Sequence, residues 1–443
     1  MLPSSHATRK ILVTLCVAIG GALALLYAVP DPQAARALAL SFVYLVLALT
    51  ELVPPFVPTM FLLAATPIAL GPLSKNYQLP TVLTWAADPV IALFAGGFAL
   101  GLAAKRHGVD SAFASRLVLW GGGSQRRLVW LLLLSAAGAS MWMSNVAAAA
   151  LLLAALGPLL DTKIDVRFQK ALLLAVAMGA NMGGMATPLG SGPNAIAIAA
   201  TRSIDFLDWM SFGVPIVLGM LVLTFGALVA LFDLSHRYTL ELDAPPALSR
   251  SGKLLLCVFA LAIGAWLTEA WHGASAPTVA LALMFVLFST GLLRREDLGE
   301  LDWATLGLIA GGLILGRLLE STGLLGTVAS SMEWQDAPRW LWLGSFVLAS
   351  AVLSALMSNT ATAALLVPLS LQIDPSPSTA VIIAIATSFG MPFPISTPPN
   401  AMVYGTGRVS VRELLQIGLP LMLIGCAVVT LSGAWFLGLL GID

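Results

Sequence analysis

Charged side chains are scarce in this chain of 443 residues: only 10% are Asp, Glu, Lys or Arg, whereas 58% are hydrophobic. The mean hydropathy of +0.93 lies far outside the range of soluble domains. Apolar runs of about 20 residues, long enough to cross a bilayer as helices, recur along the whole chain and leave no room for a soluble domain. The alternating pattern of a transmembrane barrel is missing. We therefore expect an all-α polytopic membrane protein.

The chain also lacks an excess of one charge and a cysteine framework. Lys plus Arg equals Asp plus Glu at 22 each, so nucleic acid is not an expected partner. Cys16, Cys257 and Cys426 lie in separate apolar runs without paired or metal-type spacing, and we expect them to be small buried side chains. The HExxH pattern and paired intramembrane aspartates are absent, which argues against an intramembrane enzyme. We expect neither catalytic residues nor a cofactor.

What the sequence does contain is an internal repeat of four blocks in the same order. The paired blocks are AGGFALGLAAKRHG (95–108) with AGGLILGRLLESTG (310–323), MSNVAAAALLL (143–153) with MSNTATAALLV (357–367), GGMATPLGSGPNAIA (183–197) with GMPFPISTPPNAMV (390–403), and FGVPIVLGM (212–220) with IGLPLMLIG (417–425). Four matches in one order indicate a duplicated gene.

Lys and Arg accumulate in cytoplasmic loops and so orient the two halves. Positive residues flank the first Ser-Asn block on both sides, within 105–127 and 163–170. The second is preceded only by Arg339 and is followed by residues 372–380, which carry no positive charge. We therefore expect each Ser-Asn block to be the tip of a re-entrant hairpin, the first entering from the cytoplasm and the second from outside. Such an inverted repeat is typical of secondary transporters.

The loop charges also predict the topology of the whole chain. We expect about 11 transmembrane helices, two re-entrant hairpins and two broken helices, with a cytoplasmic N-terminus and an external C-terminus. The expected divisions are N-terminal scaffold helices (1–84), a first repeat (85–235), linking scaffold helices (236–299) and a second repeat (300–443).

The broken helices are predicted by TPLGSGPN (187–194) and PISTPPN (394–400), because these prolines and glycines interrupt spans otherwise long enough to cross. Hairpin tips and helix breaks at membrane depth leave backbone groups without partners unless protein or ligand satisfies them. Carbonyl ends of half-helices suit a small cation, and amide ends suit an anion. The four features together predict a transport site near the middle of the membrane.

Each feature also has a structural reading. A single Ser-Asn pair in a membrane helix usually packs helices together, and Pro-Asn can equally mark a kink. Duplication of all four features in register favours the transport site. Arg317 and Glu320 are three residues apart on one helix, so we expect them to pair with each other rather than to contact substrate.

The twin Ser-Asn tips and twin Pro-Asn loops resemble the divalent anion/sodium symporter family, the INDY-type carriers that import succinate, citrate and related dicarboxylates. The resemblance covers about residues 85–437. It implies a homodimer in which a scaffold domain holds the dimer and a transport domain slides as an elevator.

The resemblance also implies site residues, position by position. A first sodium site would use Ser140, Ser144, Asn145 and the Gly190 backbone. A second would use Ser354, Asn359 and the carbonyls of Met357 and Ser396. The substrate would meet Asn145, Val146, Ser191, Asn359, Thr360, Thr397 and Pro398. This chain departs from the family pattern twice, because Val146 replaces the threonine of the first tip and Gly192 replaces the first proline of the first loop.

We therefore expect a transporter of the bacterial inner membrane that imports a small anion, such as the dicarboxylate succinate, with sodium. The hairpins (128–160 and 340–371) and the broken helices (171–201 and 380–407) contain no Asp, Glu or His to carry a proton. Their hydroxyl, amide and carbonyl oxygens suit sodium. The alternatives left open are a same-fold carrier for sulfate or a monocarboxylate and a sodium-independent anion exchanger.

Overall fold

The computed structural model describes residues 5–50, 53–54, 56–160, 164–238, 247–324 and 338–442. These residues form helices and no β-sheet, and an isolated bridge joins Ser124 to Arg237. Six of the helices are long and apolar enough to cross a membrane, and seven shorter apolar helices accompany them. The prediction of an all-α polytopic membrane protein is therefore confirmed.

The N-terminal part and the first half of the chain contain helices of very different length. They are α1 (Ser5–Ala28), α2 (Pro32–Thr50), α3 (Val57–Leu70), η1 (Lys75–Tyr77), α4 (Leu79–Ala86), α5 (Pro89–Arg106), α6 (Val109–Trp120), α7 (Gln125–Ser140), α8 (Asn145–Leu160), α9 (Val166–Gly183), α10 (Gly192–Thr201) and α11 (Phe206–Phe232). Side chains that accept backbone N–H groups begin several of them: Asp88 caps α5, Ser124 caps α7, and Asp205 with Asp208 forms a capping box on α11.

The linking helices and the second half follow the same pattern. They are α12 (Arg250–Leu267), α13 (Glu269–His272), α14 (Ala276–Ser289), η2 (Arg295–Glu300), α15 (Trp303–Ser321), α17 (Arg339–Leu356), α18 (Asn359–Ile373), α19 (Pro377–Ser388), α20 (Pro398–Gly405), α21 (Val411–Val428), η3 (Val429–Gly433) and α22 (Ala434–Leu439). Both predicted helix breaks are present, because residues 184–191 and 389–397 interrupt α9–α10 and α19–α20.

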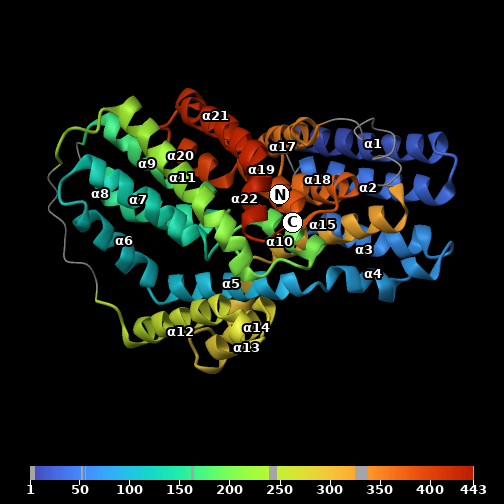
Figure 1. Cartoon of the computed structure of the whole chain (residues 1–443), viewed down its shortest axis with the longest axis horizontal. Coiled ribbons are helices and arrows are strands. Elements are labelled where there is room, and N and C mark those ends of the chain that lie inside the picture. Colours follow the sequence, from blue (N-terminus) through green and yellow to red (C-terminus); the bar gives the residue numbers. More distant parts are fainter. Residues whose placement is uncertain are drawn as a thin grey trace.

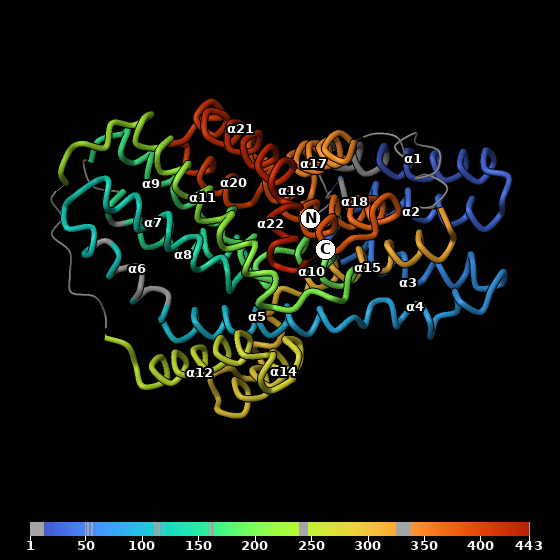
Figure 2. Tube along the Cα trace, viewed as in Figure 1, coloured from blue at the N-terminus to red at the C-terminus, as the bar shows by residue number. Residues whose placement is uncertain are grey.

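The molecule is elongated, and α5 runs along one side of it (Figure 1). The N-terminal helices α1 to α4 lie at one end with α15, and helices α6 to α9 lie at the other end (Figure 2). Helices α12 and α14 lie on the outer side of α5, where α14 packs against α5. Helix α15 packs in the same way against α3. Each half is thus flanked by one group of outer helices.

Glycines at equivalent positions make these contacts close. A Cβ on Gly96 of α5 would lie 2.7 Å from the Ala280 Cβ of α14, and a Cβ on Gly311 of α15 would lie 2.2 Å from Thr59 Oγ1 of α3. Small residues allow helix backbones to approach to this extent. The repeated AGG blocks therefore act as packing surfaces, as their composition indicates.

Each hairpin begins and ends at one end of the molecule. Arg339, the first residue of α17, forms an ion pair with Asp374, which follows α18, with 2.9 Å between Nη2 and Oδ2. At the other hairpin, the Tyr238 N–H donates to the Gly123 carbonyl before α7, and its ring lies 5.4 Å from that of Phe168 on α9. Tyr238 therefore links the start of α7 to α9, the helix that follows α8.

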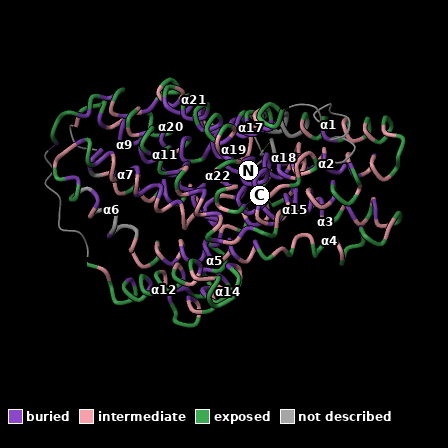
Figure 3. The backbone as a smooth tube through the Cα atoms, in the orientation of Figure 1, coloured by how far each residue is buried: buried purple, intermediate pink, exposed green. Residues whose placement is uncertain are grey.

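The two halves exchange their broken helices. Helix α10 of the first half packs against α18 and α19 of the second, whereas α20 of the second packs against α8 and α9 of the first. Helices α9 and α19 are buried along most of their length, since residues 171–183 and 378–388 are all buried (Figure 3). The core is therefore shared between the halves.

One prediction about the interior is wrong. Cys426 is buried on α21, but Cys16 and Cys257 are exposed. Both exposed cysteines lie on peripheral helices, α1 and α12, whose outward faces carry apolar side chains such as Val13 and Leu261. An apolar run in a membrane protein has no need of burial within the protein, which is why hydrophobicity alone misplaced these two side chains.

Candidate transport site

The two hairpin tips share one polar arrangement. The Ser140 hydroxyl at the end of α7 lies 2.6 Å from Asn145 Oδ1 and 2.7 Å from the Ala180 carbonyl oxygen. In the second tip, the Ser354 hydroxyl lies 2.6 Å from Asn359 Oδ1 and 2.5 Å from the Thr387 carbonyl oxygen. A hydroxyl has one proton to donate, so it can satisfy only one of its two neighbouring oxygen acceptors at a time. Both serines are fully buried.

Each broken segment is also tied to the carbonyl end of the neighbouring hairpin arm. Thr187 Oγ1 donates to the Met141 carbonyl, and Ser396 Oγ donates to the Ala355 carbonyl at 2.7 Å. These bonds satisfy part of the unpaired carbonyl ends of α7 and α17. The tips and breaks that the sequence predicted to converge are therefore in contact within each half.

The residues expected at a first sodium site lie close together. A Cβ placed on Gly184 would be 2.7 Å from Asn145 Oδ1 and 2.9 Å from the Gly190 carbonyl oxygen, so both oxygens face one small space. Only a glycine fits between them. Ser144 stands at the start of α8, where its hydroxyl accepts the Ala147 N–H at 3.3 Å. These oxygens are ligands of the type that a small hard cation requires.

The second expected set is assembled differently. Ser354 and Asn359 are joined directly, and Ser396 reaches the same arm through Ala355. Met357 lies in the short gap between α17 and α18 with extended backbone, at φ −142° and ψ −178°. Among the described residues there is no group of three or more His, Cys, Asp or Glu that could hold a metal. Cation binding at either tip would rest on neutral oxygens.

The residues expected to contact substrate differ in how far they are exposed. Asn145, Ser191 and Asn359 are half-buried. Val146 is 43% exposed and Pro398 is exposed, but Thr360 is only 8% and Thr397 only 4% exposed. Of the hydroxyls expected to bind sodium, those of Ser140 and Ser354 are therefore deeper than most of the groups expected to bind substrate, whereas Ser144 is half-buried.

The structure gives a reason for the glycine at position 192, where the family pattern has a proline. A Cβ on Gly192, the first residue of α10, would lie 2.2 Å from Thr360 Oγ1 on α18. The glycine therefore makes room for the threonine of the opposite hairpin tip.

Helices α8, α10, α18 and α20 begin at the hairpin tips and helix breaks. The amide groups at their N-termini favour an anion.

Two asparagines that the sequence reasoning did not assign organise the broken segments. Asn194 Nδ2 donates to the carbonyls of Gly184 and Thr187, both at 2.8 Å. Asn400 Nδ2 donates to the carbonyls of Met391 and Phe393 at 2.8 and 3.0 Å. Each is the last residue of its Pro-Asn motif. The recurrence of this asparagine in both halves was the sequence signal that could have identified them.

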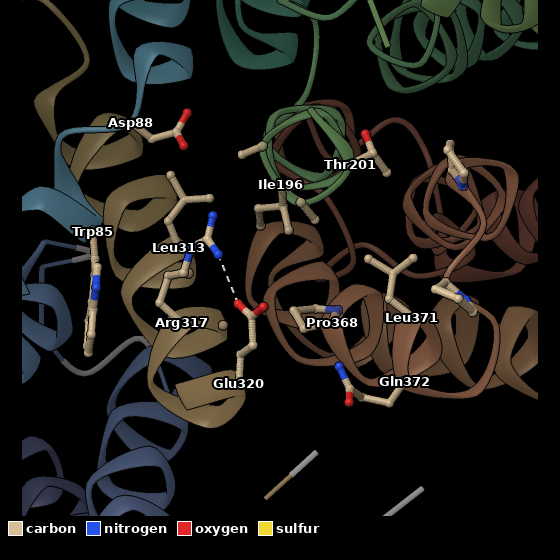
Figure 4. Close-up of a pocket in the computed structure, with 16 residues that line it drawn as sticks. Trp85, Asp88, Ile196, Thr201, Leu313, Arg317, Glu320, Pro368, Leu371 and Gln372 are labelled. Atoms are coloured by element: carbon tan, nitrogen blue, oxygen red, sulfur yellow. Dashed lines mark hydrogen bonds and ion pairs between the residues drawn. The ribbon is translucent and has the colours of Figure 1, made fainter. Parts of the chain in front are cut away.

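A cavity of about 290 Å³ lies between α10, α15 and α18 and includes Ile196 and Gly312 in its lining. Figure 4 shows Arg317 and Glu320 in it, joined by an ion pair of 2.9 Å. The predicted pairing of these two residues is therefore confirmed.

Comparisons with known proteins agree with the fold. Residues 44–390 match the citrate transporter family, CitMHS. An uncharacterized transporter of Haemophilus influenzae is 33% identical over 434 residues, which cover 92% of each chain. The sodium-dependent dicarboxylate transporter SdcS of Staphylococcus saprophyticus is 28% identical over 64% of this chain and 62% of its own.

The solved structure of the YdaH transporter from Alcanivorax borkumensis resembles this chain with a TM-score of 0.57 at 16% identity. The match covers 86% of this chain and 98% of that one, and it supports the fold. The resemblance to the divalent anion/sodium symporters is confirmed, and the protein is a transporter rather than an enzyme. With more than half of its length matched, the chain belongs to the CitMHS citrate transporter family.

Proposed function

We propose that this protein imports a small organic anion, such as the dicarboxylate succinate, together with sodium ions. The observation that carries the proposal is the pair of buried clusters at Ser140–Asn145 and Ser354–Asn359. In each, the single proton of a buried serine hydroxyl lies between two oxygen acceptors, beside the amide end of a helix. A cation at the cluster and an anion at the amide end would neutralise each other. Sodium-dependent dicarboxylate relatives support this assignment.

The hairpins and broken helices contain no Asp, Glu, His or Lys, which supports sodium rather than a proton as the coupling ion. With two sodium sites, uptake should depend steeply on sodium. A specific observation also favours the runner-up, a monocarboxylate carrier: Val146 presents methyl groups at the exposed first tip, where a threonine would offer a hydroxyl.

The decisive experiment uses purified protein in liposomes. With a sodium gradient and no pH gradient, we expect accumulation of at least one anion from a panel of succinate, citrate, butyrate and sulfate. Replacing sodium by choline on both sides should abolish it. Full uptake in choline would identify a sodium-independent exchanger, and uptake driven only by a pH gradient would identify proton coupling.

We further propose an elevator in a homodimer of the bacterial inner membrane. Residues 1–84 and 236–299 would form the scaffold, and residues 85–235 and 300–443 would carry the site. The boundary between the two parts would then follow the contacts of α5 with α14 and of α15 with α3, where glycines line the packing surface. A cross-link between α5 and α14 that blocks transport reversibly would support the elevator, whereas undiminished transport would contradict it.

The inverted arrangement of the halves has its own test. Single cysteines near Arg127 and near Arg339, on a background lacking Cys16, Cys257 and Cys426, should be labelled from opposite sides of the membrane. We expect the first to be reached from the cytoplasm, because the cytoplasmic N-terminus and external C-terminus follow from the same loop charges. Labelling of both from one side would contradict the inversion.

A further inference from the structure

The two halves meet at a buried amide pair. Asn181 Nδ2 on α9 donates to Asn400 Oδ1 on α20 at 2.9 Å. The amide of Asn400 is fixed in orientation, because its own Nδ2 donates to two carbonyls. Its oxygen therefore has to face Asn181, and the Asn181 oxygen is left without a hydrogen-bond partner among the described protein groups.

The repeat contains a second copy of this place with different residues. Asn194 on α10 corresponds to Asn400, since each donates twice to carbonyls of its own broken segment. Ser388 on α19 corresponds to Asn181, because the preceding carbonyls, those of Thr387 and Ala180, contact equivalent serines at the two tips. Helices α10 and α19 pack against each other, as α20 and α9 do.

In this second copy the two equivalent polar groups both lack a hydrogen-bond partner among the described residues. Asn194 is 0% and Ser388 only 3% exposed, and neither Asn194 Oδ1 nor Ser388 Oγ has a hydrogen-bond partner within the described part of the chain. A serine side chain is shorter than that of asparagine, so it does not span the gap that Asn181 spans. Buried polar atoms of this kind are costly unless something else satisfies them.

We propose that a sodium ion occupies the space between Ser388 and Asn194, as a site additional to those at the two hairpin tips. Two hydrogen bonds from Nδ2 fix the Asn194 amide, so its oxygen is left as an acceptor, and the repeat places the Ser388 hydroxyl where Asn181 meets Asn400. Both are oxygen ligands of the type that hard cations prefer. The site adjoins the second tip, because Thr387 contacts Ser354 through its carbonyl. The inference rests on the proposed sodium coupling.

The test places the side chain of the first half into the second. S388N should fill the gap, bond to Asn194 and exclude the ion. We expect uptake to persist with a shallower sodium dependence, the Hill coefficient falling by about one. The charge-to-substrate ratio from reversal potentials should fall by the same single ion. S388A, which removes the hydroxyl without filling the space, should give the same loss, and S388T, which retains a hydroxyl, should preserve the wild-type steepness.

A water molecule is the competing occupant, and the variants separate the two. If S388N raises the melting temperature but leaves the Hill coefficient and the reversal potential unchanged, the gap holds water and the proposal is overturned. Should S388N fail to fold, sodium-dependent thermal shifts of S388A and S388T decide the matter in the same way. A wild-type protein that transports without sodium would instead refute the proposed function itself.

Discussion

Each hairpin tip packs against the broken helix of the other half, α18 against α10 and α8 against α20. The two pairs differ in how closely they pack. Gly192 touches Thr360 in one pair, and the threonine is only 8% exposed. In the other pair Val146 is 43% exposed, and Pro398 is exposed as well. The serine and asparagine clusters behind the tips are nevertheless alike. The halves have therefore diverged at outward-facing positions and kept the same oxygen arrangement where we place the cations.

The tips also differ in their anchoring. The ring of Trp142, in the first tip, stacks on Phe206 and Trp266 with centroid distances of 6.1 and 5.8 Å. The equivalent residue of the second tip, Leu356, is 59% exposed. The first tip is thus held by ring contacts to α11 and α12, whereas the second tip packs against the broken helix α10.

The largest effect should come from removing what the tips share. Asn145→Ala and Asn359→Ala each delete an expected cation ligand and one of the two acceptors of a buried serine hydroxyl, which keeps its backbone carbonyl partner. A hydrogen bond or contact to a charged group is worth about 1.5–3 kcal/mol. We expect each to lower sodium-driven uptake at least about tenfold. Asn76→Ala, at an exposed position of η1, is the matched control. Loss of function in only one variant would show that the halves are not equivalent.

Filling the space that Gly192 leaves for Thr360 should have the next largest effect. Gly192→Ala forces a methyl group against Thr360, and overpacking of this kind costs about 1–3 kcal/mol. We expect a lower apparent melting temperature, restored in the double variant with Thr360→Ala. Gly219→Ala has open space around its Cβ and serves as the control. Failure of the second substitution to restore stability would mean that the two residues are not coupled.

The anchoring difference predicts unequal costs of truncation. Trp142→Ala removes two stacked ring contacts, worth about 0.5–1.5 kcal/mol each. Leu356→Ala, at an exposed position, should cost less than about 0.5 kcal/mol. Thermal unfolding of both variants in the same detergent measures this contrast. Equal destabilisation would remove the distinction between an anchored and an unanchored tip.

The smallest expected change concerns selectivity. Val146→Thr adds a hydroxyl donor to the exposed tip, and one hydrogen bond is worth about 1 kcal/mol, enough to change relative affinity several-fold. We expect the ratio of succinate to butyrate uptake to rise. Val166→Thr, an equally conservative change at an exposed residue of α9, is the control. An unchanged ratio would show that Val146 does not face the substrate.

Local features of this fold were predictable from sequence because their signals are local. Prolines and glycines at 187–194 and 394–400 break helices wherever they occur in a span, and the Ser-Asn pairs lie where the hairpin arms begin and end. Serines five residues before Asn145 and Asn359 reach those asparagines across a tip. Backbone geometry alone brings such groups together.

Contacts between the halves were not predictable in this way. The approach of Gly192 to Thr360 and the bond of Asn181 to Asn400 join residues far apart in sequence, and no periodicity encodes them. A glycine in place of a proline could be recognised as a departure, but its reason lies on the opposite hairpin. The stacking of Trp142 on Trp266 likewise depends on where α12 packs.

The exchange of broken helices also constrains how the protein is made. Helix α10 is complete once Thr201 has left the ribosome, yet α18 and α19, which cover it, begin only at Asn359 and Pro377. During translation the first half must therefore lie in the bilayer with α10 uncovered until the second half has been made. Neither half has its own finished core, so a half-length chain would need a second copy of itself to complete this fold.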